Sequence, residues 1–125
     1  MSIILITGAT SGFGEAAAHL FAKNNWNLII TGRRKERLEK LENDLKSIYK
    51  IEVLSLCFDV QNLNEVQAAI NSINDDWKNI DVLLNNAGLA VGRGPIQEGS
   101  YEDWNQMIDT NVKGLLYMTR EISPL

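Results

Sequence analysis

The chain has 125 residues, a length that fits one domain, and its 45% hydrophobic and 22% charged residues exclude a wholly disordered chain. No apolar run is long enough to form a helix that spans a bilayer. The formal net charge of -4 argues against a nucleic-acid-binding surface, because phosphate backbones are bound by clustered Lys and Arg.

The single cysteine, Cys57, can form neither an internal disulfide nor a thiolate metal site. No carboxylate pair has metal-ligand spacing, and no basic segment precedes a long apolar stretch at the N-terminus, as a secretory signal would require. We therefore expect a cytoplasmic protein with no metal site. Cys57 falls in an apolar run, so we expect its side chain in the core.

Short apolar runs alternate with amphipathic segments along the chain. Strands are predicted at residues 3–6, 27–31, 52–58 and 80–84, and helices at residues 13–23, 38–48, 63–73 and from 101 to about 122. The last helix begins after Ser100, an N-cap with Asp103 as its capping-box partner, and we expect a break near Asp109. Because the strands alternate with helices, the sequence predicts an α/β fold with a parallel sheet.

The first helix contains several apolar residues at helical spacing. The predicted packed face consists of Phe13, Ala16, Ala17, Leu20 and Phe21. No fifth strand follows the last helix to cover the fourth strand, and an uncovered strand edge promotes aggregation. We therefore expect the sequence to be the first half of a longer protein.

A glycine-rich segment at residues 7–14 lies directly between the first strand and the first helix. Its glycines, Gly8, Gly12 and Gly14, have the spacing G-x-x-x-G-x-G. Such a turn lets the backbone approach a phosphate, and the free N–H groups of the helix favour a pyrophosphate there. No Lys follows the glycines, so the segment is not a P-loop. The alternative is a strand-to-helix turn that binds nothing.

Residues 31–35, at the end of the second strand, read Thr-Gly-Arg-Arg-Lys and contain no acid. Domains that bind NAD place an Asp or Glu in this region for the adenosine 2′-hydroxyl. Cations at a helix N-terminus oppose the helix dipole at roughly 0.3–1 kcal/mol each, which favours a bound anion. We therefore predict that Arg33 and Arg34 hold the 2′-phosphate of NADP; the alternative is a solvated basic turn balanced by Glu36 and Glu39.

Three further short stretches follow in order: Asp59-Val60, Asn85-Asn86-Ala87-Gly88, and Asn111 within residues 109–114. Together with the glycine-rich turn they resemble the N-terminal half of a single-domain short-chain dehydrogenase/reductase. The resemblance covers essentially the whole chain. Four ordered motifs are far more specific than a glycine turn alone.

The resemblance implies a binding site for NADP. The implied cofactor-binding residues are Gly8, Thr10, Ser11, Gly12, Phe13, Gly14, Arg33, Arg34, Asp59, Val60, Asn86, Ala87 and Gly88. Asp59 is expected to accept from the adenine amino group with Val60 beside the ring, and residues 86–88 are expected near the ribose. Asn111 is the implied catalytic residue, whose backbone helps to hold a water in the proton relay to the active-site Lys. The residues alone leave open strand-end capping by residues 85–86 and a helix kink at Asn111.

The catalytic Ser and the Tyr-x-x-x-Lys motif of that family do not occur in the sequence. Tyr49, Tyr101 and Tyr117 are followed four residues later by Val53, Asn105 and Glu121. General acid–base help is typically worth about 10²–10⁴-fold in rate. We therefore expect this chain to bind a nucleotide and not to catalyse by itself.

The resemblance implies a Rossmann-like, doubly wound parallel sheet of strand order 3-2-1-4, with the ligand where the order reverses. The complete enzyme would transfer a hydride between NADP(H) and a hydroxyl or carbonyl carbon. Residues 85–90, 103–104, 107–111 and 117–120 are similar to NADP-dependent serine/3-hydroxy acid dehydrogenases, which implies a short 3-hydroxy acid as the small-molecule substrate. The alternatives are a generic carbonyl or 3-oxoacyl reductase and a non-catalytic NADP-sensing module. The resemblance also implies a homo-dimer or homo-tetramer.

Overall fold

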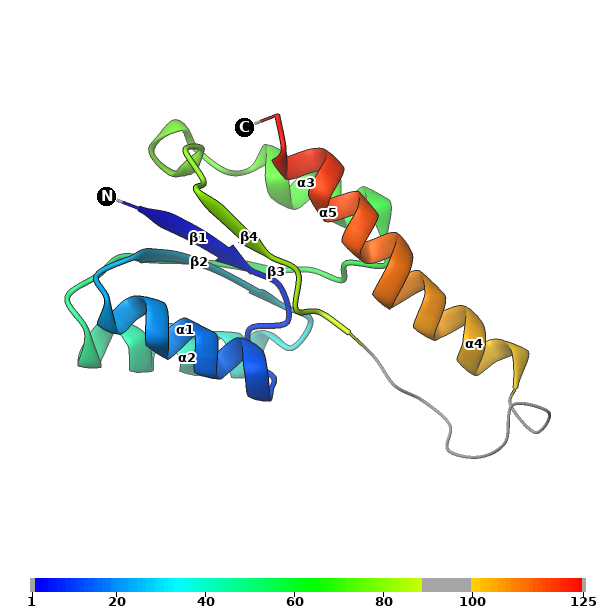
Figure 1. Cartoon of the computed structure of the whole chain (residues 1–125), viewed down its shortest axis with the longest axis horizontal. Coiled ribbons are helices and arrows are strands. Elements are labelled where there is room, and N and C mark those ends of the chain that lie inside the picture. Colours follow the sequence, from blue (N-terminus) through cyan, green and yellow to red (C-terminus); the bar gives the residue numbers. More distant parts are fainter. Residues whose placement is uncertain (1, 89–99, 125) are drawn as a thin grey trace.

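The computed structural model describes residues 2–88 and 100–124 (Figure 1). Its strands are β1 (Ile3–Ile6), β2 (Asn27–Gly32), β3 (Val53–Cys57) and β4 (Val82–Leu84). Its α-helices are α1 (Gly12–Lys23), α2 (Lys35–Ile48), α3 (Leu63–Asn71), α4 (Tyr101–Ile108) and α5 (Gly114–Ile122). A 3-10 turn occupies Asp75–Trp77, and a π-helical turn occupies Asp109–Lys113.

The four strands form one parallel sheet in the order β3-β2-β1-β4, as the sequence predicts. β1 lies between β2 and β4, with Ile4 paired to Leu28 on one side and to Val82 on the other. Because all of the strands run in the same direction, their carboxyl ends lie along one edge of the sheet. The order reverses between β1 and β4, which is where doubly wound sheets bind ligands.

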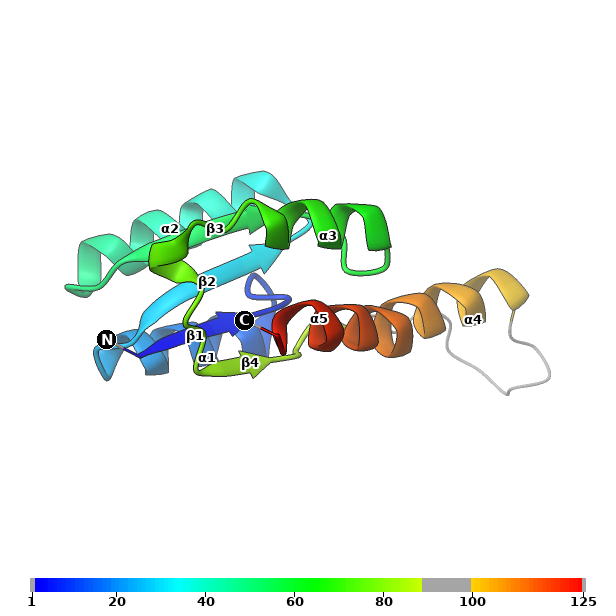
Figure 2. The same cartoon turned by 90° about the horizontal axis from the view of Figure 1, so that it is seen from above.

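Helices cover both faces of the sheet. Helices α1 and α2 lie on one face, and α3 and α5 lie on the other (Figures 1 and 2). The side chains of β1 alternate between the two cores: Ile4 and Ile6 pack with α1 and α2, whereas Ile3 and Leu5 pack with α3 and α5. This two-sided burial explains why the first two strands read as unbroken apolar runs.

The packed face of α1 differs from the prediction. Phe13 is 87% exposed and Leu20 is 59% exposed, and Ala16 is exposed as well. The buried positions of the helix are Gly14, Ala18 and Ala22, while Ala17 and Phe21 pack partly against the core. Small side chains on the buried face let the helix lie close to the sheet. The buried face is therefore the one with the smallest side chains and not the one with the most hydrophobic side chains.

Cys57 ends the edge strand β3, and its side chain is exposed, so the prediction of a core cysteine is wrong. Its thiol donates weakly to the carbonyl oxygen of Arg33, over 3.6 Å. Among the described residues, no helix is long and apolar enough to cross a membrane.

The predicted break near Asp109 is a π-helical turn that joins α4 to α5. The two helices form one rod, and α4 extends past the end of the sheet (Figures 1 and 2). Ser100 caps α4 as predicted, because its hydroxyl accepts from the N–H of Asp103 over 3.0 Å. Lys113 and Asp109 form an ion pair of 3.1 Å along the π turn, and the hydrogen bond that Lys113 donates to the carboxylate of Asp109 raises the pKa of Lys113. Such π turns often occur at functional sites.

Candidate functional site

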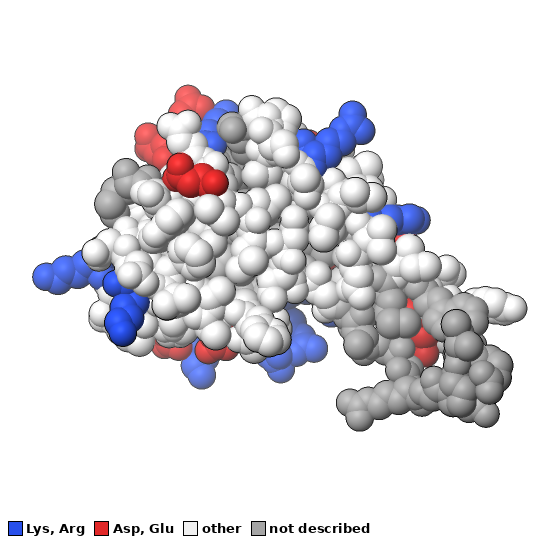
Figure 3. All heavy atoms as spheres, viewed as in Figure 1, with Lys and Arg blue, Asp and Glu red and all other residues white. Residues whose placement is uncertain are grey.

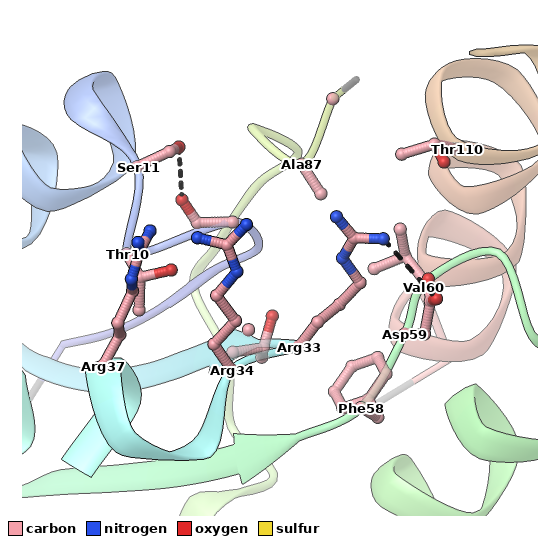
Figure 4. Close-up of a pocket in the computed structure, with 14 residues that line it drawn as sticks. Thr10, Ser11, Arg33, Arg34, Arg37, Phe58, Asp59, Val60, Ala87 and Thr110 are labelled. Carbon is pink, nitrogen blue, oxygen red and sulfur yellow. Dashed lines mark hydrogen bonds and ion pairs between the residues drawn. The ribbon is translucent and has the colours of Figure 1, made fainter. Parts of the chain in front are cut away.

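A pocket of about 190 Å³ opens at the carboxyl edge of the sheet, where loops that follow all four strands meet the π turn (Figure 4). Its lining residues are Gly8, Thr10, Ser11, Thr31, Gly32, Arg33, Arg34, Arg37, Phe58, Asp59, Val60, Ala87, Gly88 and Thr110. The pocket therefore lies at the reversal of strand order, where the sequence places the ligand.

At two positions of the 7–14 segment, the backbone conformation and packing of the protein require glycine. Gly8 has φ +62°, and a Cβ there would lie 2.8 Å from the Cα of Ala87. A Cβ at Gly14 would lie 2.2 Å from the carbonyl oxygen of Gly8. At Gly12, by contrast, a Cβ would have no neighbour within 4 Å. The packing of the protein therefore does not require glycine at position 12. The close approach of a ligand to the backbone would explain a glycine there.

The N-terminus of α1 beside this turn is open. Ser11 is the N-cap residue, but its hydroxyl donates to the carbonyl oxygen of Gly8 over 2.9 Å and caps no helix N–H. In α3, Asn62 does accept from the N–H of Glu65 over 3.1 Å. The first N–H groups of α1 are thus available to an anion, which the helix dipole also favours.

Asn86 ties the loop after β4 to the glycine turn. Its side-chain amide donates to the carbonyl oxygen of Gly8 over 3.0 Å and to the hydroxyl of Ser11 over 3.3 Å. The hydroxyl of Thr7 in turn accepts from the N–H groups of Asn86 and Ala87, each over 3.0 Å. Asn86 thereby holds two pocket loops in place, and its side chain is not part of the pocket lining.

Three arginines project from the N-terminal end of α2 into the pocket (Figure 4). Arg33 points across the pocket toward Asp59, and its Nη1 lies 3.9 Å from Asp59 Oδ2. Arg34 and Arg37 lie on the other side, near Thr10. Arg37 was not predicted, although its spacing of three residues from Arg34 places both on one helix face.

Asp59 and Val60 form the wall opposite the arginines. Asp59 Oδ1 accepts from the backbone N–H of Gln61 over 3.1 Å, and Asp59 Oδ2 accepts from the Gln61 side chain over 3.0 Å. Val60 is 5% exposed and packs against Gly114, where a Cβ would lie 2.7 Å from Val60 Cγ2. The absence of a side chain at Gly114 therefore lets α5 approach this wall.

The π turn contributes the remaining side of the pocket. Thr110 is 6% exposed, and its buried hydroxyl has no hydrogen-bond partner among residues 2–88 and 100–124. Asn111, the predicted catalytic residue, is exposed and faces the loop after β4, since a Cβ at Gly88 would lie 3.2 Å from Asn111 Oδ1. The π turn thus brings residues 110–111 next to residues that precede them by more than twenty positions.

The structure gathers most of the predicted site residues. Those that line the pocket are Gly8, Thr10, Ser11, Arg33, Arg34, Asp59, Val60, Ala87 and Gly88. Those that lie outside its lining are Gly12, Phe13, Gly14, Asn86 and Asn111. The lining residues that sequence reasoning missed are Thr31, Gly32, Arg37, Phe58 and Thr110. The side chain of Phe13 is almost fully exposed, so it contacts little of the described protein.

On the face seen in Figure 3, the coloured Lys and Arg side chains lie in separate small groups around the rim. In the described part of the chain, no three His, Cys, Asp or Glu side chains are grouped so that they could hold a metal ion. The pocket, with its three arginines and open helix end, is suited to an anionic ligand.

Comparison with known proteins identifies the family. The chain belongs to the short chain dehydrogenase family, whose sequence model matches residues 2–125. The chain is 48% identical over 122 residues to an NADP-dependent 3-hydroxy acid dehydrogenase of Salmonella typhi, a match that covers 98% of this chain and 48% of the relative. It is 44% identical over 121 residues to a serine 3-dehydrogenase of Agrobacterium fabrum, covering 97% and 47%.

A solved structure agrees with these relatives. The closed form of a serine dehydrogenase complexed with NADP+ is 46% identical, with a TM-score of 0.87 over 98% of this chain and 48% of that chain. The chain spans about half the length of the curated relatives it matches.

Proposed function

We propose that this chain is the NADP(H)-binding half of a short-chain dehydrogenase domain that transfers a hydride between NADP(H) and a hydroxyl or carbonyl carbon. The observation that carries the proposal is the pocket at the reversal of strand order, which combines an uncapped helix N-terminus with three arginines. Gly32, at the end of β2, stands where domains that bind NAD carry an acid. A 2′-phosphate is therefore favoured over a free 2′-hydroxyl.

The residues of the pocket fit this dinucleotide. Gly12 leaves open the space that a pyrophosphate needs, and the first N–H groups of α1 supply donors for it. Arginines beside Thr10 supply charge-assisted hydrogen bonds to a 2′-phosphate. Asp59 would accept from the adenine amino group, with Val60 beside the ring, and the place of both residues in the pocket lining supports these roles. When bound, NADP(H) supplies the carbon that donates or accepts the hydride.

We also propose that residues 1–125 orient the cofactor while the general acid comes from elsewhere in the protein. None of Tyr49, Tyr101 and Tyr117 has a Lys four residues later. Asn111 would help to hold a water for the proton relay, and its position beside Gly88, which lines the pocket, supports that role.

For the substrate we propose a short 3-hydroxy acid such as serine. Two relatives with this type of activity in their names align with nearly the whole chain at 44–48% identity. A generic carbonyl or 3-oxoacyl reductase and a non-catalytic NADP sensor are the alternatives. All three functions would use the same cofactor-binding site, so that site does not distinguish between them.

Turnover separates these functions. The full natural protein should be incubated with NADP+ and L-serine, L-allo-threonine or 3-hydroxybutyrate, and NADPH should be followed by its absorbance. Oxidation of the hydroxy acids is expected. Activity only on simple ketones or 3-oxoacyl substrates with NADPH would favour the generic reductase, and NADP binding with no turnover on the whole panel would favour the sensor.

We propose that the complete protein assembles as a homo-dimer or homo-tetramer through its last helices. The side chains of Ile108, Val112 and Leu116 follow one another at four-residue spacing and are 49–57% exposed. Light scattering of the full natural protein would give a monomer if the proposal is wrong.

A cytoplasmic location is also proposed, since the exposed Cys57 thiol suits a reducing compartment.

A further inference from the structure

The hydroxyl group of Thr110 is buried at the edge of the pocket without a hydrogen-bond partner. Thr110 lines the pocket and is 6% exposed, and its Oγ1 has no partner in the part of the chain that the structure describes. Oδ1 of Asn85 is also buried without a partner, but the amide of Asn85 donates to Thr119 over 3.2 Å and lies outside the pocket lining. Among the described residues of the pocket, Thr110 is therefore the one with a buried and unsatisfied side-chain hydroxyl.

The packing of the protein does not explain a hydroxyl group at position 110. A buried hydroxyl without a partner destabilises a fold, because water binds that group in the unfolded chain. Valine has nearly the same shape and helix propensity as threonine and would avoid this cost. Packing alone therefore favours valine at this position, and a ligand that binds the hydroxyl would explain threonine.

Thr110 lies on one particular side of the pocket. Figure 4 shows it on the side of Asp59 and Val60, across the pocket from Arg34. Threonine in a helix populates two χ1 rotamers, so a rotation that exchanges its methyl and hydroxyl groups turns the hydroxyl toward the pocket. A neutral hydroxyl suits the nitrogen and oxygen acceptors of an adenosine group, whereas phosphates are matched by the arginines and the open end of α1.

On these grounds, which rest on the proposed NADP site, we propose that the Thr110 hydroxyl forms a hydrogen bond to the adenosine part of the bound dinucleotide. Thr110 is the one buried residue of the π turn Asp109–Lys113, and Asn111 follows it directly. A bond between Thr110 and the ligand therefore fixes the turn and, with it, the backbone of Asn111. Thr110 is thus a positioning residue that links cofactor binding to the proposed proton relay.

Two substitutions at this position separate the hydroxyl from the rest of the side chain. Thr110→Val removes the hydroxyl and keeps the shape, and Thr110→Ser keeps the hydroxyl. Thr119→Val is the matched control, because the Thr119 hydroxyl already donates to the carbonyl oxygen of Leu115 over 2.8 Å and lies outside the pocket lining. Calorimetry on the full natural protein should use NADP+ and adenosine 2′,5′-bisphosphate, which share the adenosine group although only NADP+ carries the nicotinamide half.

In Thr110→Val, both dissociation constants should rise by the same factor, about threefold to tenfold, because one hydrogen bond is lost. Thr110→Ser and Thr119→Val should each change them by less than about twofold. The stability of the free protein should move in the opposite direction from its affinity. Thr110→Val should raise the melting temperature by about 2–4 °C, since an unsatisfied hydroxyl is removed, whereas Thr119→Val should not raise it.

Amide hydrogen exchange tests the link between the ligand and the π turn. Saturating adenosine 2′,5′-bisphosphate should slow exchange at residues 109–113 in the wild type and in Thr110→Ser, because the bound ligand holds the turn. In Thr110→Val the same residues should gain much less protection, even when the site is saturated. Equal protection in Thr110→Val and the wild type would refute the link to Asn111.

Unchanged dissociation constants in Thr110→Val would overturn the proposal, because the hydroxyl would then be bound by an ordered water or by another part of the protein. Equal losses in Thr110→Val and Thr110→Ser, a loss for NADP+ alone, or a lowered melting temperature of free Thr110→Val would overturn it as well. A wild-type protein that binds neither probe would instead refute the NADP site. Failure of the proposed function is thereby distinguished from failure of the role of Thr110.

Discussion

The side-chain amide of Asn86 donates a 3.0 Å hydrogen bond to the carbonyl oxygen of Gly8, across a separation of 78 residues. The bond connects the loop after β4 to the turn after β1, which are the two loops on either side of the point where the strand order reverses. The shape of the pocket therefore depends on a contact that the protein makes with itself, before any ligand is bound.

The Asn86→Ala substitution should lower the free energy of unfolding by about 0.5–1.5 kcal/mol, because the partly buried carbonyl oxygen of Gly8 loses one of its donors. It should also weaken nucleotide binding, since the turn at Gly8 is no longer held. Denaturant unfolding and nucleotide titration measure the two effects. Asn43→Ala on the exposed face of α2 is the control; it should leave nucleotide binding unchanged and should not lower stability, because Ala favours a helix more than Asn does. Equal behaviour of the two variants would refute the role of Asn86.

Gly12 and Gly14 should respond differently to the same added methyl group. Gly14→Ala should destabilise the protein by several kcal/mol, because its Cβ would lie 2.2 Å from the Gly8 carbonyl oxygen and backbone would have to move. Gly12→Ala should leave the melting temperature unchanged, because its Cβ meets nothing, and should weaken NADP binding by about tenfold or more. Unchanged NADP binding in Gly12→Ala would contradict a pyrophosphate at this turn.

Gly114 and Val60 should be energetically coupled. Gly114→Ala should cost about 1–3 kcal/mol of stability, since the new Cβ would lie 2.7 Å from Val60 Cγ2. In a Val60→Ala background the same substitution should cost much less, because the clashing methyl group is gone. A double-mutant cycle in denaturant measures this coupling, and additive effects would show that α5 does not pack on Val60 as described.

Glu42 on α2 should make stability depend on pH. Burial opposes its ionisation, but hydrogen bonds from Ser55 and Lys46 outweigh burial and lower its pKa below the usual 4.5. A carboxyl group with a lowered pKa stabilises the fold above its unfolded-state pKa and loses this contribution as the pH falls through the folded-state value. Glu42→Gln should therefore be less stable than the wild type at neutral pH, by on the order of 1 kcal/mol.

The difference between the wild type and Glu42→Gln should shrink as the pH falls below about 4.5. Unfolding curves in denaturant across this pH range measure it. The control is Glu39→Gln, because Glu39 is exposed and lies 3.9 Å from Lys35; it should change stability by less than about 0.5 kcal/mol. A constant difference for Glu42→Gln across the range would refute the lowered pKa.

A parallel α/β sheet is predictable from the sequence because apolar runs alternate with helical patterns, whereas the strand order 3-2-1-4 follows only from the resemblance to the short-chain dehydrogenases. The buried face of α1 is not predictable in the same way. Hydrophobicity selects Phe13 and Leu20, whereas the sheet accepts only the small side chains of Gly14, Ala18 and Ala22 at close range. The separation between a helix and a sheet is set in three dimensions and has no signal in hydrophobic spacing.

The candidate site is likewise predictable from the sequence only in part. The glycine turn and the arginines after β2 are adjacent in sequence to strand ends, so their meeting at one edge of the sheet follows from the fold. Arg37 was missed because it lies among the charged residues of an amphipathic helix, where exposed arginines are common. Its spacing from Arg34 is the one signal that the sequence offers. Cys57 was misplaced because the prediction rested on its apolar run alone, although the predicted strand order already put the third strand at the edge of the sheet.

Titration of the full natural protein with NADP+ and with NAD+ tests the central claim most directly, that this fold presents a pocket built for a dinucleotide carrying a 2′-phosphate. The account predicts saturable binding of both cofactors, with a dissociation constant for NADP+ at least about tenfold below that for NAD+. Equal affinities, tighter binding of NAD+ or no binding of either cofactor would contradict it.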